Sequence, residues 1–138
     1  MITNALTVDV EDYIHVSAFE KSIDRKDWGK IPLRVVDNTR RLLQLFADSE
    51  VKATFFVLGW VAEREPELVR DIAAEGHEVA CHGYSHELVY NQSPEVFRQE
   101  TIRSKSLLEY ITQAPVYGYR AASYSITERS LWALDVLC

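Results

Sequence analysis

The sequence has few cysteines and no long apolar run, and both scarcities limit the class of protein. Of 138 residues two are cysteines, and one of them, Cys138, is the last residue. A disulfide framework is therefore not expected. No segment approaches the roughly 18 apolar residues needed to cross a bilayer, and the N-terminal stretch lacks the basic start and long apolar core of a secretion signal. We expect a cytoplasmic chain without a transmembrane segment.

Positive charge is also in short supply. The chain carries 15 Lys and Arg residues against 21 Asp and Glu residues, for a formal net charge of −6. It therefore lacks the basic surface that binds nucleic acid or anionic membranes, and we expect neither partner. The apolar content of 47% is typical of a globular protein and argues against disorder. We expect one domain over residues 1–138.

Strand-like and helix-like segments alternate along the chain. Four apolar segments have the pattern of strands buried in a sheet, namely residues 6–10, 51–59, 77–83 and 116–123. Apolar residues at spacings of three and four predict helices after Pro32, Pro66, Ser93 and Thr127. Four strand-then-helix units imply parallel strands, either in an open sheet or in part of a (β/α) barrel. A complete barrel takes about 200 residues or more, so we expect a C-terminally truncated barrel.

Polar side chains collect at one end of the predicted strands. They are Asp9, Glu11 and Asp12 after the first strand, His82 and His86 after the third, and Arg120 in the fourth. Because the carboxyl ends of parallel strands share one rim, these residues are expected to line one pocket. Two imidazoles and a carboxylate suit a divalent metal with open coordination positions. A second carboxylate, paired with Arg120, could then take a proton from water.

Each of these features alone has an ordinary explanation. A histidine pair four residues apart occurs by chance in many proteins, an acidic turn after a strand is usually solvated, and a lone arginine usually forms a surface ion pair. Their joint placement on one rim favours a site. His77 lies at the opposite strand end and is expected to be structural, and His15 is expected to be a loop residue more than a pocket-lining one. Four aromatic residues could equally stack on a sugar ring or pack under loops: Tyr13, Trp60, Tyr84 and Tyr124.

Three segments, TVDVEDY, HGYSH and YRAASYS, occur in that order. They resemble the first three motifs of polysaccharide deacetylases of carbohydrate esterase family 4, the nodulation-factor deacetylase homology domain. The VDVEDY and RAASYS forms look most like the subgroup linked to exosortase-associated exopolysaccharide gene clusters. The resemblance implies a distorted (β/α) barrel, here the N-terminal half with about four βα units. It also implies that N-acetyl groups are removed from sugars of a bacterial polysaccharide with a divalent metal, foremost Zn²⁺, with Co²⁺, Ni²⁺ and Mn²⁺ as alternatives.

The resemblance also assigns roles to residues by position. It makes Asp9 the catalytic base, Arg120 the residue that orients it, and His82 and His86 metal ligands. The usual first motif has two adjacent aspartates, whereas Val10 follows Asp9 here, so the third ligand is Glu11 or Asp12. Strand alternation favours Glu11, but a bend after the strand could bring in Asp12.

The third motif carries the expected oxyanion site. The resemblance places the oxyanion donor at a backbone N–H near Ser123 or Tyr124, and Ala122 replaces the usual proline there. The family's later motifs, including the histidine that protonates the leaving amine, have no counterpart in the 138 residues. We therefore expect the chain alone to bind metal but to catalyse poorly or not at all. Uncovered strand edges in a half barrel make homodimerisation or aggregation a further hypothesis.

Two other functions compete with a polysaccharide deacetylase. The same scaffold could hydrolyse small amides or cyclic ureides, because the motifs define the bond better than the molecule that carries it. The chain could also be a noncatalytic carbohydrate-binding remnant. The presence of both a base and a complete set of metal ligands argues against the second alternative.

Overall fold

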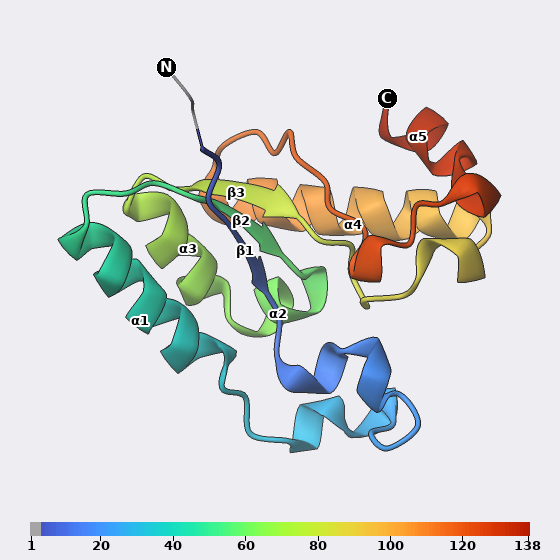
Figure 1. Ribbon diagram of the computed structural model, residues 1–138, viewed down its shortest axis with the longest axis horizontal. Coiled ribbons are helices and arrows are strands. Elements are labelled where there is room, and N and C mark those ends of the chain that lie inside the picture. The colour runs from blue at the N-terminus through green and yellow to red at the C-terminus, as the bar shows by residue number, and fades with distance from the viewer. Residues whose placement is uncertain (1–3) are drawn as a thin grey trace.

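The computed structural model, described here for residues 4–138, is built on a three-stranded parallel sheet (Figure 1). The strands are β1 (Thr7–Val10), β2 (Thr54–Val57) and β3 (Glu78–Cys81), and they pair in the order β1-β2-β3. The predicted α/β class with parallel strands is confirmed. The first three residues of the expected domain lie outside the described part of the chain.

Helices connect the strands. The α-helices are α1 (Val35–Asp48), α2 (Gly59–Arg64), α3 (Pro66–Ala74), α4 (Pro94–Thr112) and α5 (Trp132–Leu137). Short 3₁₀ helices occupy Tyr13–His15, Ser17–Phe19, Arg25–Lys30, Val89–Asn91, Ala122–Tyr124 and Glu128–Ser130. Ser93 caps α4 as predicted, because its side chain accepts a hydrogen bond from the Val96 N–H. The helix α2 was not predicted, since the apolar run of β2 continues into its first residues without a polar cap.

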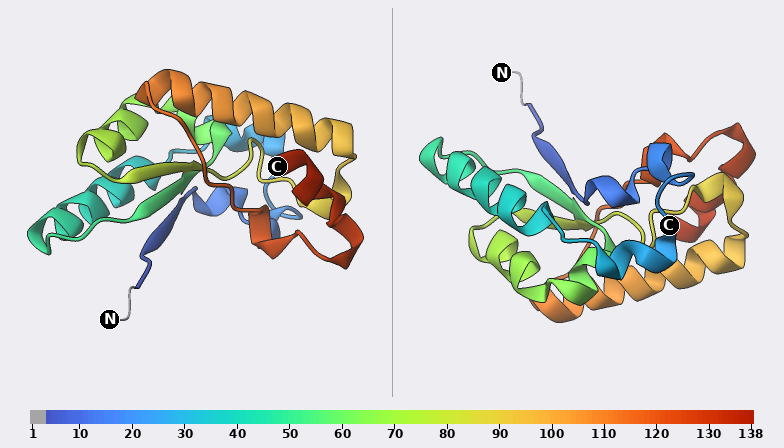
Figure 2. Two further views of the ribbon diagram at one scale, coloured as in Figure 1. Left: turned by 90° about the horizontal axis from the view of Figure 1, so that it is seen from above. Right: turned by 90° about the horizontal axis from the view of Figure 1, so that it is seen from below.

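The two faces of the sheet differ in character. Val10, Phe55, Val57 and Val79 point into the apolar core, which the helices cover, and Figure 2 shows α3 and α4 along this side of the sheet. Residues that alternate with these in sequence, such as Asp9, point to the opposite face. The polar residues of β1 are therefore kept away from the helical layer.

The prediction of a fourth strand over residues 116–123 is wrong. This segment pairs with β3 at one bridge, between Cys81 and Tyr119. The Cys81 N–H donates to the Gly118 carbonyl at 2.8 Å, and the Arg120 N–H donates to the Cys81 carbonyl at 2.9 Å. The pairing stops because the chain then turns into the 3₁₀ helix at residues 122–124, where backbone angles become left-handed. One bridge nevertheless places Arg120 beside the end of β3.

His77 is structural, as predicted. Its Nδ1 atom accepts a hydrogen bond from the Ala53 N–H at 3.1 Å, and its ring packs against Phe46 and Phe55 with centroid distances of 5.9 and 5.0 Å. The residue is buried at the amino end of β3. It therefore belongs to the core at the strand end opposite to the polar rim.

His15 is not the plain loop histidine that was expected. It is fully buried, and its ring lies edge-on to Trp28 and Trp60 with centroid distances of 4.6 and 4.9 Å. Its Nδ1 atom accepts a hydrogen bond from the Asp12 N–H at 2.8 Å. Burial lowers the pKa of His15 to about 4. The imidazole is therefore a neutral part of an aromatic cluster under the loop that follows β1.

This burial makes folding stability sensitive to pH. The pKa of His15 is about 4 in the folded chain and about 6.5 in an unfolded chain. Between these values the unfolded chain binds more protons, so stability falls as the pH drops from 7 to 5, by roughly 2 kcal/mol from this residue. Urea unfolding at both pH values should show a smaller loss in His15→Asn, whose side-chain oxygen can still accept the Asp12 N–H. An equal loss in variant and wild type would contradict this explanation.

Candidate functional site

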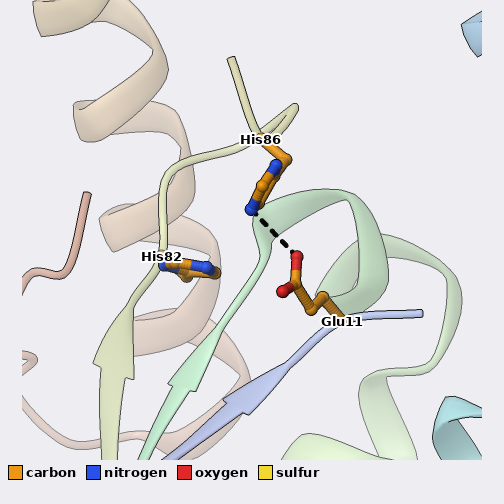
Figure 3. Close-up of side chains that lie close together, drawn as sticks. All are labelled: Glu11, His82 and His86. Carbon is orange, nitrogen blue, oxygen red and sulfur yellow. Dashed lines mark ion pairs between the residues drawn. The ribbon is translucent and has the colours of Figure 1, made fainter. Parts of the chain in front are cut away.

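Glu11, His82 and His86 come together beyond the carboxyl ends of β1 and β3, as Figure 3 shows. One carboxylate oxygen and one nitrogen from each imidazole all lie within 4.8 Å of one another. The distance between His86 Nε2 and Glu11 Oε2 is 3.0 Å, and the two imidazole centroids are 5.3 Å apart. Both histidines are buried. Within residues 4–138 this is the one group of three or more His, Cys, Asp or Glu side chains with the geometry of a metal site.

The backbone of Arg120 fixes the tautomer of His82. The distance between His82 Nδ1 and the Arg120 carbonyl oxygen is 2.8 Å. Because a carbonyl can only accept, Nδ1 carries the proton and Nε2 keeps its lone pair. Burial lowers the pKa of His82, which favours the neutral ring. A neutral imidazole with a free Nε2 is the form that ligates a metal.

The carboxylate of Glu11 faces the histidines in an ionised form. Burial would raise the pKa of Glu11, but the hydrogen bond of His86 and the electrostatic attraction of the nearby imidazoles of His86, His82 and His15 together outweigh it, so this pKa lies below its usual value. Apart from the contact with His86, Glu11 Oε2 has no hydrogen-bond partner among the described residues. A buried carboxylate oxygen with so few partners, beside two imidazoles, is suited to a cation. The residues present therefore fit a divalent metal.

Asp12, the other candidate for the third ligand, is not part of this group. Its carboxylate accepts hydrogen bonds from the backbone N–H groups of Tyr13 at 2.9 Å, Arg34 at 2.5 Å and Val35 at 2.9 Å. These bonds occupy both oxygens, and the residue is buried. Asp12 thus ties the loop after β1 to the start of α1. The structure brings Glu11, and not Asp12, to the two histidines.

Asp9 and Arg120 form an ion pair beside the group. Arg120 Nη1 donates to Asp9 Oδ1 at 2.5 Å, and Nη2 donates to Thr7 Oγ1 at 2.9 Å. The guanidinium carbon also lies 4.0 Å from the centre of the Phe56 ring. These contacts fix the guanidinium, which in turn orients the Asp9 carboxylate. Thr7 was not predicted as part of the site, although strand alternation puts Thr7 and Asp9 on one face of β1, with Glu11 just after the end of the strand.

Ser123 and Tyr124, where the oxyanion donor is expected, lie in the 3₁₀ helix after Arg120. Both have left-handed backbone angles, with φ values of +47° and +55°. The Ser123 hydroxyl oxygen is 3.2 Å from that of Ser17, which belongs to the loop after β1. The Tyr124 side chain is 90% exposed. The two loops of the rim are therefore in contact here, and the oxyanion role of these residues stays a prediction.

The chain is similar to proteins named as deacetylases over about 70% of its length. The family model described as polysaccharide deacetylase matches residues 26–137. A peptidoglycan-N-acetylglucosamine deacetylase of Bacillus cereus is 33% identical over 98 residues, which are 70% of this chain and 36% of the relative. A chitooligosaccharide deacetylase of Sinorhizobium fredii is 36% identical over 100 residues, which are 72% of this chain and 44% of the relative. The chain thus spans less than half the length of these two relatives.

Solved structures share the fold. A peptidoglycan N-acetylglucosamine deacetylase superposes with a TM-score of 0.71 at 27% identity, over 95% of this chain and 51% of the other. A CE4-family pseudoenzyme from Bacillus anthracis superposes with a TM-score of 0.72 at 21% identity, over 95% and 39%, and supports the fold alone. The expected (β/α) fold of the deacetylase type is confirmed over the part of these structures that the chain matches, whereas the exosortase-linked subgroup and the C-terminal truncation stay predictions. By its family match, its relatives and its fold, the chain belongs to the polysaccharide deacetylase family.

Proposed function

We propose that the protein is a metal-dependent deacetylase that removes N-acetyl groups from sugars of a bacterial polysaccharide. The observation that carries this proposal is the convergence of Glu11, His82 and His86 beside the Asp9–Arg120 ion pair. Family membership and relatives named as peptidoglycan and chitooligosaccharide deacetylases support it. The exopolysaccharide as substrate rests on the sequence resemblance of the first and third motifs.

We propose that Glu11, His82 and His86 hold the metal ion. Two imidazole nitrogens and one carboxylate oxygen suit Zn²⁺, and three protein ligands leave coordination positions for water and substrate. Co²⁺, Ni²⁺ and Mn²⁺ are the alternatives that the same ligands accept. When bound, such an ion makes water more acidic and polarises a carbonyl oxygen.

The residues of this chain then have distinct tasks. The Asp9 carboxylate accepts the proton of the attacking water, and Arg120 keeps this carboxylate in the correct orientation through its direct hydrogen bond. A backbone N–H near Ser123 or Tyr124 donates to the oxygen on which negative charge develops. We propose that the leaving amine takes its proton from an acid outside these 138 residues, and that the chain alone is therefore poorly active or inactive.

Location and assembly are separate proposals. Within residues 4–138, no helix is both long enough and apolar enough to cross a bilayer. We propose a cytoplasmic location and a homodimer from the sequence considerations given above. Light scattering coupled to size-exclusion chromatography measures the assembly directly.

Replacing Glu11 and replacing Asp12 should affect different properties of the protein, zinc binding and folding stability respectively. Glu11→Gln removes a proposed ligand and should weaken zinc binding by at least about tenfold, measured by competition with a chelator. Asp12→Asn keeps the ligands but loses acceptor capacity for buried N–H groups, so it should lower the free energy of unfolding by about 1–3 kcal/mol. Its zinc affinity should stay within about threefold of wild type. The reverse pattern would make Asp12 the ligand.

Removing the base should affect turnover more than metal binding. In the complete protein, Asp9→Asn should lower the rate of acetate release from a chito-oligosaccharide by about 10²- to 10⁴-fold, because an amide cannot accept the proton. Zinc content, measured by atomic emission, should remain that of wild type. Unchanged acetate release in this variant would remove Asp9 from the base role.

A further inference from the structure

The stretch between the two histidines of the site is attached to the helical layer. The Gly59 N–H donates to the Gly83 carbonyl at 2.8 Å, and the Trp60 N–H donates to the Tyr84 carbonyl at 3.0 Å. Both donors belong to the first turn of α2, where N–H groups lack partners within the helix. The backbone between the histidines is therefore bound to the start of α2.

The side chain of Tyr84 joins this stretch to two helices. Its hydroxyl group donates to Glu63 Oε2 of α2 at 2.6 Å and accepts from Arg103 Nη2 of α4 at 2.6 Å. Arg103 also donates to Glu63 Oε1 at 2.9 Å, and its guanidinium carbon lies 3.6 Å from the centre of the Tyr84 ring. We call Tyr84, Glu63 and Arg103 the Tyr84 clasp.

Gly59 lets the Tyr84 ring pack directly on α2. A β carbon at this position would lie 2.7 Å from Tyr84 Cδ2 and 2.5 Å from Ser104 Oγ. Such distances are shorter than any ordinary contact, so the ring already fills the space above Gly59. The clasp on one side of the ring and the helix backbone on the other leave Tyr84 little freedom to move.

The two histidines depend on this attachment to different degrees. His82 has an orienting partner of its own, the carbonyl of Arg120. His86 Nδ1 has no hydrogen-bond partner among the described residues, and the backbone of His86 is left-handed with φ +54°. That conformation costs about 1–2 kcal/mol for a residue with a β carbon. The position of the His86 imidazole is therefore set by the chain that leads to it.

We propose that Tyr84 is a positioning residue for the metal site, and that the Tyr84 clasp sets the position of His86 relative to His82. This inference rests on the proposed function, because it requires a metal at Glu11, His82 and His86. It predicts a loss of metal affinity that exceeds any loss of folding stability. A purely structural role predicts instead that replacing a residue of the clasp lowers metal affinity and folding stability by the same amounts as replacing an equivalent surface contact elsewhere.

Zinc titration of Tyr84→Phe, measured by competition with a chelator, tests the proposal. The variant keeps the ring but loses both hydrogen bonds of the hydroxyl group, and we expect about 3- to 10-fold weaker binding. Tyr110→Phe makes the same chemical change at an exposed site of α4 and should leave the affinity unchanged. With Co²⁺ in place of zinc, the visible absorption spectrum of Tyr84→Phe should differ from that of wild type, because it reports ligand geometry.

Two further variants, Arg103→Met and Glu63→Gln, test the hydrogen-bond partners of the Tyr84 hydroxyl group. Arg103→Met should resemble Tyr84→Phe, whereas Arg40→Met, which removes the exposed Arg40–Asp71 ion pair between α1 and α3, should bind zinc as wild type does. Glu63→Gln keeps an acceptor for the Tyr84 hydroxyl group and should bind more tightly than Glu63→Ala. Thermal unfolding of the metal-free variants shows whether affinity and stability change together.

The outcomes separate this inference from the proposed function. If the wild type does not bind zinc or Co²⁺, the proposed metal site fails and the positioning role fails with it. If the wild type binds and Tyr84→Phe binds as tightly as Tyr110→Phe, the positioning role is overturned while the metal site stands. The same holds if Arg40→Met loses as much affinity as Arg103→Met.

Discussion

The pairing of Arg120 with the end of β3 is the contact on which the candidate site depends. Its N–H donates to the Cys81 carbonyl, its own carbonyl accepts from His82 Nδ1, and its guanidinium holds Asp9. A single residue thus sets the tautomer of one proposed metal ligand and the orientation of the proposed base. Gly118 permits this close approach, because a β carbon there would lie 3.0 Å from the β carbon of Ala80. A short bridge, and not a full strand, is sufficient to connect β1 and β3 across the rim.

The residues of the rim can be predicted from the sequence because the topology of a parallel sheet brings the carboxyl ends of its strands together. Parallel strands place their carboxyl ends together whatever the details of packing, so the order of strands and helices alone brings Asp9, Glu11, His82 and His86 near one another. Arg120 was expected there as part of a fourth strand, and it reaches the rim through the single bridge between Cys81 and Tyr119. The role of Asp12 could not be predicted in this way. Its partners include the N–H groups of Arg34 and Val35, which lie 22 and 23 residues further along the chain. Periodicity carries no information about such long-range capping.

Two features of the fold were not predicted correctly, the segment of residues 116–123 and the helix α2, and both have a similar origin. Periodicity reports which side chains are apolar, and it does not report where the backbone finds hydrogen-bond partners. Residues 116–123 have the composition of a strand, but the left-handed angles of Ser123 and Tyr124 end the pairing early. The helix α2 begins inside an apolar run because its first N–H groups are satisfied by the carbonyls of Gly83 and Tyr84. Both features are decided by contacts between distant segments.

The register of β1 explains why the third proposed ligand is Glu11 in a chain whose Asp9 is followed by valine. The strand runs to Val10, whose side chain is 1% exposed in the core on the helix-covered face. A carboxylate at position 10 would be buried among apolar side chains, where an unpaired charge is costly. The next position on the face of Asp9 is residue 11, and alternation puts it about 6.6 Å further along the chain. In this chain the proposed base on β1 and the proposed ligand just after β1 are therefore separated by a buried position that an apolar residue suits.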